Sequence, residues 1–313
     1  MITAWGQKRP ILLIFLAFVF VVLAACLISP WAYWIVQQLT GIAWIAPIAE
    51  FPFHRFFSRT AQICLIVTLV PVAFILGISK LRDLGLEKNS HRFPDVAMGI
   101  FAALVPVVIL AVIYVWHDVY RPRKDLELLP LFRIFLTAGV VSCLEEFLFR
   151  GVFLGLAIRS MGALRGSVLV SLIFAAVHFL RPAKPAASEV TWTSGFSQLG
   201  AVLENLPAMP ILAFGFVTLF VAGLILAWVT LKTRSLWLAI GIHAGWIIGQ
   251  QGLNWFARFR ASPPDEFLPW LGPNVVSGVV PTGILPLFAL AMAAALVTVY
   301  LHYARRHRAS LNP

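Results

Sequence analysis

The sequence predicts an all-α polytopic membrane protein, a helix bundle with about eight transmembrane helices. Of its 313 residues, 60% are hydrophobic and only 12% are charged. The mean hydropathy is +0.90, which a soluble domain with a polar surface does not reach. Several apolar runs have the ~20 residues that a helix needs to cross the bilayer core. Because these runs are uninterrupted, they exclude the alternating pattern of a membrane β-barrel and leave helices.

Eight apolar windows of this length follow one another along the chain. They cover residues 11–36, 61–79, 96–116, 131–157, 164–181, 209–231, 236–256 and 281–303. The first and the fourth are long enough to tilt in the bilayer or to extend beyond it. Long connections that contain proline separate some of the windows, at residues 37–60, 182–208 and 257–280.

The positive charge of the chain is distributed along its loops and ends. The net charge is +11, but Lys and Arg form no cluster interleaved with aromatic residues, which argues against a nucleic-acid partner. A small excess of Lys and Arg falls on the side of the N-terminus. By the positive-inside rule, we expect both termini in the cytoplasm.

Two acidic residues, Glu145 and Glu146, lie side by side deep inside an apolar window, with Arg150 four residues further on. A charged group in the bilayer core costs roughly 2.5–3.5 kcal/mol on insertion scales, so such residues usually mark a functional site. Glu146 and Arg150 have the spacing of a helical ion pair. Glu145 is rotated by about 100° from Glu146 and points elsewhere, as a general base requires. The alternative is that all three merely tie helices together.

Two histidines, His178 and His243, lie inside other apolar windows at a comparable depth, counted at about 1.5 Å per residue from the nearest charged boundary. Three helices can therefore contribute to one polar site. Phe174 lies one turn before His178 and can fix its ring. For each histidine, the alternative is a structural residue in a packed interior.

Other catalytic chemistries find little support. The sequence has no H-E-x-x-H, C-x-x-C, Walker or G-x-S-x-G motif. Cys143 could form a nucleophile pair with a histidine. It lies about 200° around the helix from Glu145, however, so the two cannot share a face.

The motifs resemble those of a known family. Glu145 to Arg150 fits E-E-x-x-x-R, Phe174 to His178 fits F-x-x-x-H, and His243 stands where a third motif begins with histidine. In this order and in separate apolar helices, they are similar to the CAAX prenyl protease type II family, whose bacterial members are called CPBP intramembrane proteases or Abi proteins. The resemblance covers about residues 131–250.

The resemblance implies an intramembrane endopeptidase that cleaves a membrane-associated protein or peptide. Glu145 would activate the attacking water, His178 would assist in positioning or protonation, and His243 would help to hold the oxyanion. Glu146 and Arg150 would order the helix that presents Glu145. In a second assignment Glu145, His178 and His243 hold a divalent metal such as zinc, which lowers the pKa of its bound water. The family further implies a lipid-bilayer location, and we expect a bacterial inner membrane.

One residue departs from the family pattern. Position 247 is Ile, where the third motif commonly has an asparagine. Gln250 and Asn254 lie on roughly the same helix face as His243, but about 10–16 Å further along the axis. Trp246 could supply its indole N–H as a donor instead.

The motifs divide the chain into three parts. Residues 1–130 form about three N-terminal transmembrane helices, and residues 131–250 form the protease-like core. Residues 251–313 form an extracytoplasmic loop, the last transmembrane helix and a basic tail. Two other functions remain open: a proton-coupled transporter, because intramembrane Glu and His also relay protons, and a non-catalytic immunity or scaffold protein.

Overall fold

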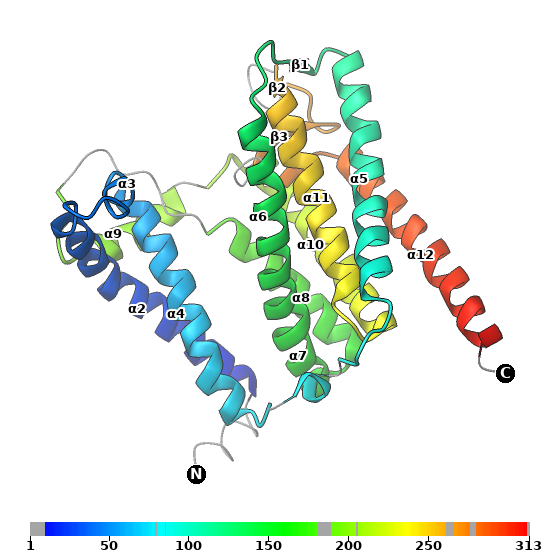
Figure 1. Ribbon diagram of the computed structural model, residues 1–313, viewed down its shortest axis with the longest axis horizontal. Coiled ribbons are helices and arrows are strands. Elements are labelled where there is room, and N and C mark those ends of the chain that lie inside the picture. The colour runs from blue at the N-terminus through cyan, green and yellow to red at the C-terminus, as the bar shows by residue number, and fades with distance from the viewer. Residues whose placement is uncertain are drawn as a thin grey trace. The chain divides into compact units, whose positions relative to one another are not determined.

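The computed structural model describes residues 10–78, 80–84, 86–180, 189–204, 206–260, 266–275 and 280–311. These residues form helices and two small two-stranded sheets (Figure 1), which confirms the all-α class. The chain divides into two compact units: Met1–Lys80 with Phe179–Leu206, and Leu81–His178 with Pro207–Pro313. The three-part division by motifs follows different criteria and stays a prediction.

Six helices in the described part of the chain are long and apolar enough to span a membrane. They are Leu12–Gln38, Phe53–Ile75, Arg92–Trp116, Leu128–Met161, Met209–Thr233 and Leu285–Tyr303. Two of the eight predicted windows are not among them. Helix α8, Ala163–His178, has only 16 residues. Helix α11, Trp237–Phe256, carries Gln and Asn side chains along its second half, which lower its hydropathy.

The first unit is built on two long apolar helices. Helix α2, Pro10–Gln38, packs against α4, Phe53–Ile75, and against α9, Ser194–Glu204. The short helix α3, Ala46–Ala49, caps this pair because the side chain of Gln37 donates a 2.7 Å hydrogen bond to the carbonyl of Ala49. Helix α9 lies within the segment 182–208, which was expected to be a connection and of which residues 182–188 and 205 are outside the described residues.

The second unit surrounds helix α11. The long helices are α5, Arg92–Trp116; α6, Leu128–Glu146; α10, Met209–Thr233; and α12, Leu285–Leu311. Helix α11 packs against α5, α6 and α10 (Figure 1), and eleven of its 20 residues are buried. Because its neighbours replace lipid around it, α11 can carry polar side chains.

Helix α6 continues through a π-helical segment into a second pair of helices. The segment η2, Phe147–Phe153, leads into α7, Leu154–Met161, and then into α8. Helix α8 packs against α7 and α10. A single 3₁₀ turn, η1, Leu81–Leu84, precedes α5.

Two short two-stranded sheets lie in the connections of the second unit. Strand β1, Tyr120–Pro122, pairs antiparallel with β2, Ala257–Phe259. Strand β3, Gly272–Val275, pairs antiparallel with β4, Val280–Thr282. Arg121, within β1, donates a 2.8 Å hydrogen bond to Asp118 just before the strand, which lowers the pKa of Asp118 below its usual value.

Helices α5 and α11 approach closely through glycines. Added Cβ atoms at Gly241, Gly245 and Gly249 would press on Val96, Ile100 and Val107 respectively. A Cβ at Gly99 would lie 2.7 Å from the backbone nitrogen of Ile242. Residue numbers at the contacts increase in the same direction on both helices, from Val96 beside Gly241 to Val107 beside Gly249. Helices α5 and α11 therefore run parallel. This is the small-residue packing by which membrane helices associate without a hydrophobic driving force.

This packing predicts a position-specific effect of adding one methyl group. Gly241→Ala should lower the unfolding temperature in detergent, because the new Cβ meets the backbone of Val96; overpacking of this kind costs about 1–3 kcal/mol. Gly252→Ala on the same helix is the matched control, since nothing lies within 4 Å of its added Cβ. Equal unfolding temperatures for the two variants would contradict the close approach.

Candidate active site

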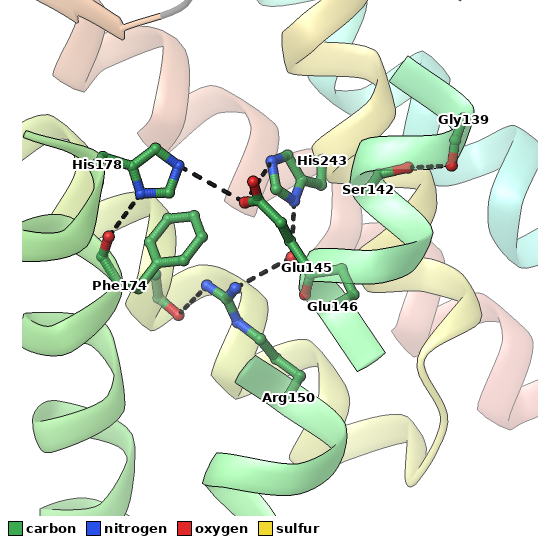
Figure 2. A network of polar contacts seen from close by, with 9 residues as sticks. Gly139, Ser142, Glu145, Glu146, Arg150, Phe174, His178 and His243 are labelled. Carbon is green, nitrogen blue, oxygen red and sulfur yellow. Dashed lines mark hydrogen bonds and ion pairs between the residues drawn. The ribbon is translucent and has the colours of Figure 1, made fainter. Parts of the chain in front are cut away.

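Five residues expected to form the site lie together in the second unit (Figure 2). Glu145 and Glu146 end helix α6, and Arg150 lies in the π-helical segment η2. His178 is the last residue of α8, and His243 lies in the first half of α11. Three helices that are distant in sequence therefore present their polar groups to one point, as their matched depth predicts.

Glu146 connects Arg150 to His243. Its side chain is fully buried and its Oε1 accepts a 3.0 Å hydrogen bond from Nη1 of Arg150. The same oxygen lies 2.7 Å from Nδ1 of His243. The expected i, i+4 ion pair is present; the bond to His243 was not foreseen. Because the carboxylate accepts, Nδ1 of His243 carries the hydrogen and its Nε2 keeps a lone pair.

Arg150 is enclosed on all sides. It is 1% exposed, and its Nη2 lies 3.4 Å from the carbonyl oxygen of Gly223 in α10. The guanidinium carbon lies 4.2 Å from the centre of the Phe174 ring, a cation–π contact that favours burial of the charge. The role of Gly223 was missed by sequence reasoning. Its only signal is a glycine inside an apolar helix, where an added Cβ would lie 2.9 Å from Ser171.

His178 is oriented by its own helix. Its Nδ1 lies 2.6 Å from the carbonyl oxygen of Phe174, so Nδ1 donates and Nε2 keeps a lone pair. The centre of its ring lies 4.4 Å from that of Phe174, as the i, i+4 spacing predicts. The ring centre of Phe174 also lies 5.9 Å from that of His243. One buried aromatic side chain therefore supports both imidazoles.

Glu145 faces both imidazoles without bonding to either. Its Oε2 lies 3.6 Å from Nε2 of His178 and 3.9 Å from Nε2 of His243 (Figure 2). Among the described residues this oxygen has no hydrogen-bond partner, although it is buried. A carboxylate and two imidazole lone pairs repel one another unless a hydrogen-bond donor or a cation lies between them. The spacing suits a water molecule that donates one hydrogen to Glu145 and the other to one of the two imidazoles.

The same three side chains are the candidate metal ligands. One carboxylate and two imidazoles match the donor types of catalytic zinc sites, and a carboxylate behind His243 is the usual support for a ligating histidine. Within the described ranges, however, no group of three or more His, Cys, Asp or Glu side chains is arranged to hold a metal ion. The donor chemistry therefore fits a metal, whereas the spacing does not form a closed coordination shell.

The other residues considered in the sequence analysis differ in whether they lie near the site. Cys143 is exposed on the outer side of α6, as its angular position predicts. Ile247 is 4% exposed and lines an apolar cavity with Trp246, Gln250, His178 and His243. Asn254 accepts a 3.2 Å hydrogen bond from Asn274 and does not line this cavity.

The buried ion pair predicts a stability effect that depends on both partners. Glu146→Leu should destabilise the protein by about 3–5 kcal/mol, because it leaves the buried charge of Arg150 without a counterion. The double variant Glu146→Leu with Arg150→Met should recover much of the lost stability. Thermal unfolding of both variants in detergent measures this. Additive losses in the double variant would show that the two charges do not stabilise each other.

The comparisons with known proteins agree with the motifs. Residues 127–248 match a family model described as "Rce1-like: Type II CAAX prenyl endopeptidase Rce1-like". No curated protein and no solved structure matches the chain. The match covers the two glutamates, Arg150 and both histidines, and it confirms the resemblance that the motifs indicate. Residues 127–248 of this membrane protein are therefore similar to the Rce1-like, type II CAAX prenyl endopeptidase family, a family of peptidases.

Proposed function

We propose that this protein is an intramembrane endopeptidase that hydrolyses a peptide bond of a membrane-associated protein or peptide. One observation carries the proposal: the buried Glu145 Oε2 has no hydrogen-bond partner among the described residues and faces Nε2 of His178 and of His243 at 3.6 and 3.9 Å. A catalytic base needs an available oxygen within one water of a reacting group. Glu145 has this geometry, and Glu146 does not, because it is bonded to Arg150 and His243.

In the proposed reaction, a water molecule lies between Glu145 and the two imidazoles. Glu145 takes a proton from this water while the water oxygen bonds to the carbonyl carbon of the peptide. The carbonyl electron pair moves to the oxygen, which becomes an oxyanion. When the tetrahedral intermediate collapses, the carbon–nitrogen bond breaks and the leaving nitrogen receives the proton held by Glu145.

The other site residues orient these groups. His178 has its Nδ1 fixed by the Phe174 carbonyl, so its Nε2 accepts a hydrogen bond from the water or receives a proton during the reaction. His243 is fixed by Glu146; a proton that its Nε2 receives from solvent before the reaction, and keeps throughout it, forms a hydrogen bond to the oxyanion. Arg150 holds Glu146 in place and thereby acts on His243 without touching the substrate.

Loss of the base should abolish hydrolysis. In liposomes with membrane-tethered reporter peptides, Glu145→Gln and His178→Ala should each reduce the cleavage rate about 10²–10⁴-fold, the usual contribution of general acid–base catalysis. Cys143→Ala is the matched control, because Cys143 lies two residues away and points out of the site. Cleavage that is indifferent to Glu145 would refute the assignment. Substrate or proton flux across the liposome membrane without cleavage would instead favour the transporter. A wild-type protein that shows neither cleavage nor flux would favour the scaffold.

A metal-assisted form of the same reaction is the second candidate. It is favoured by the protonated Nδ1 atoms of both histidines, which leave two Nε2 lone pairs beside the Glu145 carboxylate. If bound there, the metal would supply a Lewis acid that lowers the pKa of water. Glu145, His178 and His243 would hold it.

Metal content and inhibition by a chelator separate the two forms. In the direct mechanism, the purified protein should contain no stoichiometric metal, and a membrane-permeant chelator should leave the cleavage rate unchanged. About one zinc per chain, lost together with activity on chelation and absent from His178→Ala, would support the metal form instead. The structural control is the unfolding temperature, which should be the same for wild type and His178→Ala.

We further propose that the protein resides in a bacterial inner membrane with both termini in the cytoplasm. The support is the small excess of Lys and Arg on that side of the predicted spans. Residues 1–9 and 312–313 lie outside the described residues.

A further inference from the structure

An apolar cavity extends from the two histidines along helix α11. His178 and His243 line it at one end, and Trp246 and Gln250 line it further along α11. Tyr114 of α5 also lines it. Because α5 and α11 run parallel, with Val107 beside Gly249, Tyr114 lies beyond the level of Gln250. The cavity therefore follows the axis of α11 away from Glu145 rather than surrounding it.

Two polar groups in this cavity are buried and have no hydrogen-bond partner in the described part of the chain. They are the Nε1 atom of Trp246 and the hydroxyl of Tyr114. Gln250, which is 8% exposed, lines the same cavity. Buried polar groups in native proteins nearly always have a partner. Two unpaired groups beside Gln250 in one apolar cavity therefore indicate a ligand or water that bonds to them.

The hydrogen-bonding capacity of these side chains indicates which chemical group of a ligand they bind. The indole N–H only donates, and the amide of Gln250 offers two donor hydrogens. No Lys or Arg side chain lines the cavity, so a carboxylate would lack a counterion in an apolar environment. A neutral carbonyl oxygen is the group that these donors fit.

The spacing of Trp246 and Gln250 matches an extended peptide. They are four residues apart on α11, which corresponds to about 6 Å along the helix axis. Carbonyls on one side of an extended chain repeat every two residues, or about 6.6–6.8 Å. Helical side chains lean toward the helix N-terminus, and because both donors lean in the same direction, their separation along the axis stays close to that of their Cα atoms. The two donors can thus bond to alternate carbonyls of one strand.

We infer that Trp246 and Gln250 bind the backbone of the substrate peptide, an inference that rests on the proposed peptidase function. Trp246 lies closer to His243 and donates its indole N–H to the oxyanion, in place of the amide that Ile247 lacks. Gln250 donates to the carbonyl two residues away and positions the chain. The cavity volume is about 80 Å³, far below the ~300 Å³ of pockets that enclose whole small molecules. The residues bound along α11 are therefore small, such as Ala, Ser or Gly.

The test uses one probe for both binding and cleavage. The probe is a fluorescein-labelled peptide with a Leu-rich membrane anchor followed by an Ala- and Ser-rich segment, and the protein is the full chain in nanodiscs. Binding is measured on the Glu145→Gln background, where no hydrolysis occurs. Gln250→Met should raise the Kd of the probe about 3- to 10-fold. Gln251→Met, the matched control, changes the neighbouring glutamine that does not line the cavity and should leave the Kd unchanged.

Cleavage kinetics then separate the two roles. Trp246→Phe should lower kcat about 10²-fold, as loss of an oxyanion donor does, while Gln250→Met should raise KM and leave kcat nearly unchanged. Replacing the small residues of the probe by Phe should remove binding. A probe in which an (E)-alkene replaces the peptide bond whose carbonyl binds Gln250 should raise KM as Gln250→Met does. In the Gln250→Met variant the same probe should cause no further rise in KM.

The possible failures point to different errors. Saturable binding that weakens in Gln250→Met but not in Gln251→Met supports the site even if no bond is cut, and absence of cleavage then counts against the proposed function alone. Absence of saturable binding, or equal Kd values for all variants with normal unfolding temperatures, overturns the inference. Wild-type rates for both Trp246→Phe and Gln250→Met, together with an inactive Glu145→Gln, overturn it while the peptidase assignment stands.

Discussion

The buried carboxylate of Glu146 is the interaction on which the arrangement of the site depends. Its Oε1 accepts from Arg150 and bonds to Nδ1 of His243, and Arg150 reaches the Gly223 carbonyl of α10. One carboxylate thus links the end of α6, the π-helical segment, α10 and α11. Charges in an apolar interior are tolerated only when they are paired and hydrogen-bonded. This need forces the helices into one relative position and sets the tautomer of His243.

The neighbouring carboxylate differs because no arginine in the described part of the chain forms an ion pair with it. Glu145 has one buried oxygen without a hydrogen-bond partner in the described part of the chain, and its side chain is 30% exposed. Two adjacent residues of the same chemical type therefore have separate tasks. The residue locked by Arg150 holds the framework together, and the residue free of Arg150 is available to water and substrate. Phe174 adds to this division, since its ring contacts His178, His243 and Arg150 without offering a competing polar group.

Helix α11 brings the histidine and the cavity into this framework. Its glycines allow close approach to α5, and its position among other helices buries eleven of its 20 residues. For this reason it carries His243 and Gln250 in buried positions. The same enclosure explains why α11 is less apolar than a lipid-exposed span, and why a hydropathy window alone does not describe its place in the fold.

The sequence by itself determined the helical membrane class, the resemblance of about residues 131–250 to a protease family and the identities of the five clustered polar residues. It could do so because the cost of charge in lipid is large and local, so Glu145, Glu146, Arg150, His178 and His243 stand out wherever their helices pack. The tertiary structure alone decided that Glu146 bonds to His243, that Gly223 supplies a carbonyl to Arg150, and that Gln250 shares a cavity with both histidines. Nothing local in the sequence marks the π-helical segment or the parallel approach of α5 and α11 either. These features depend on the rotation and offset of helices that are far apart in the chain, and only the packing of the whole second unit fixes those quantities.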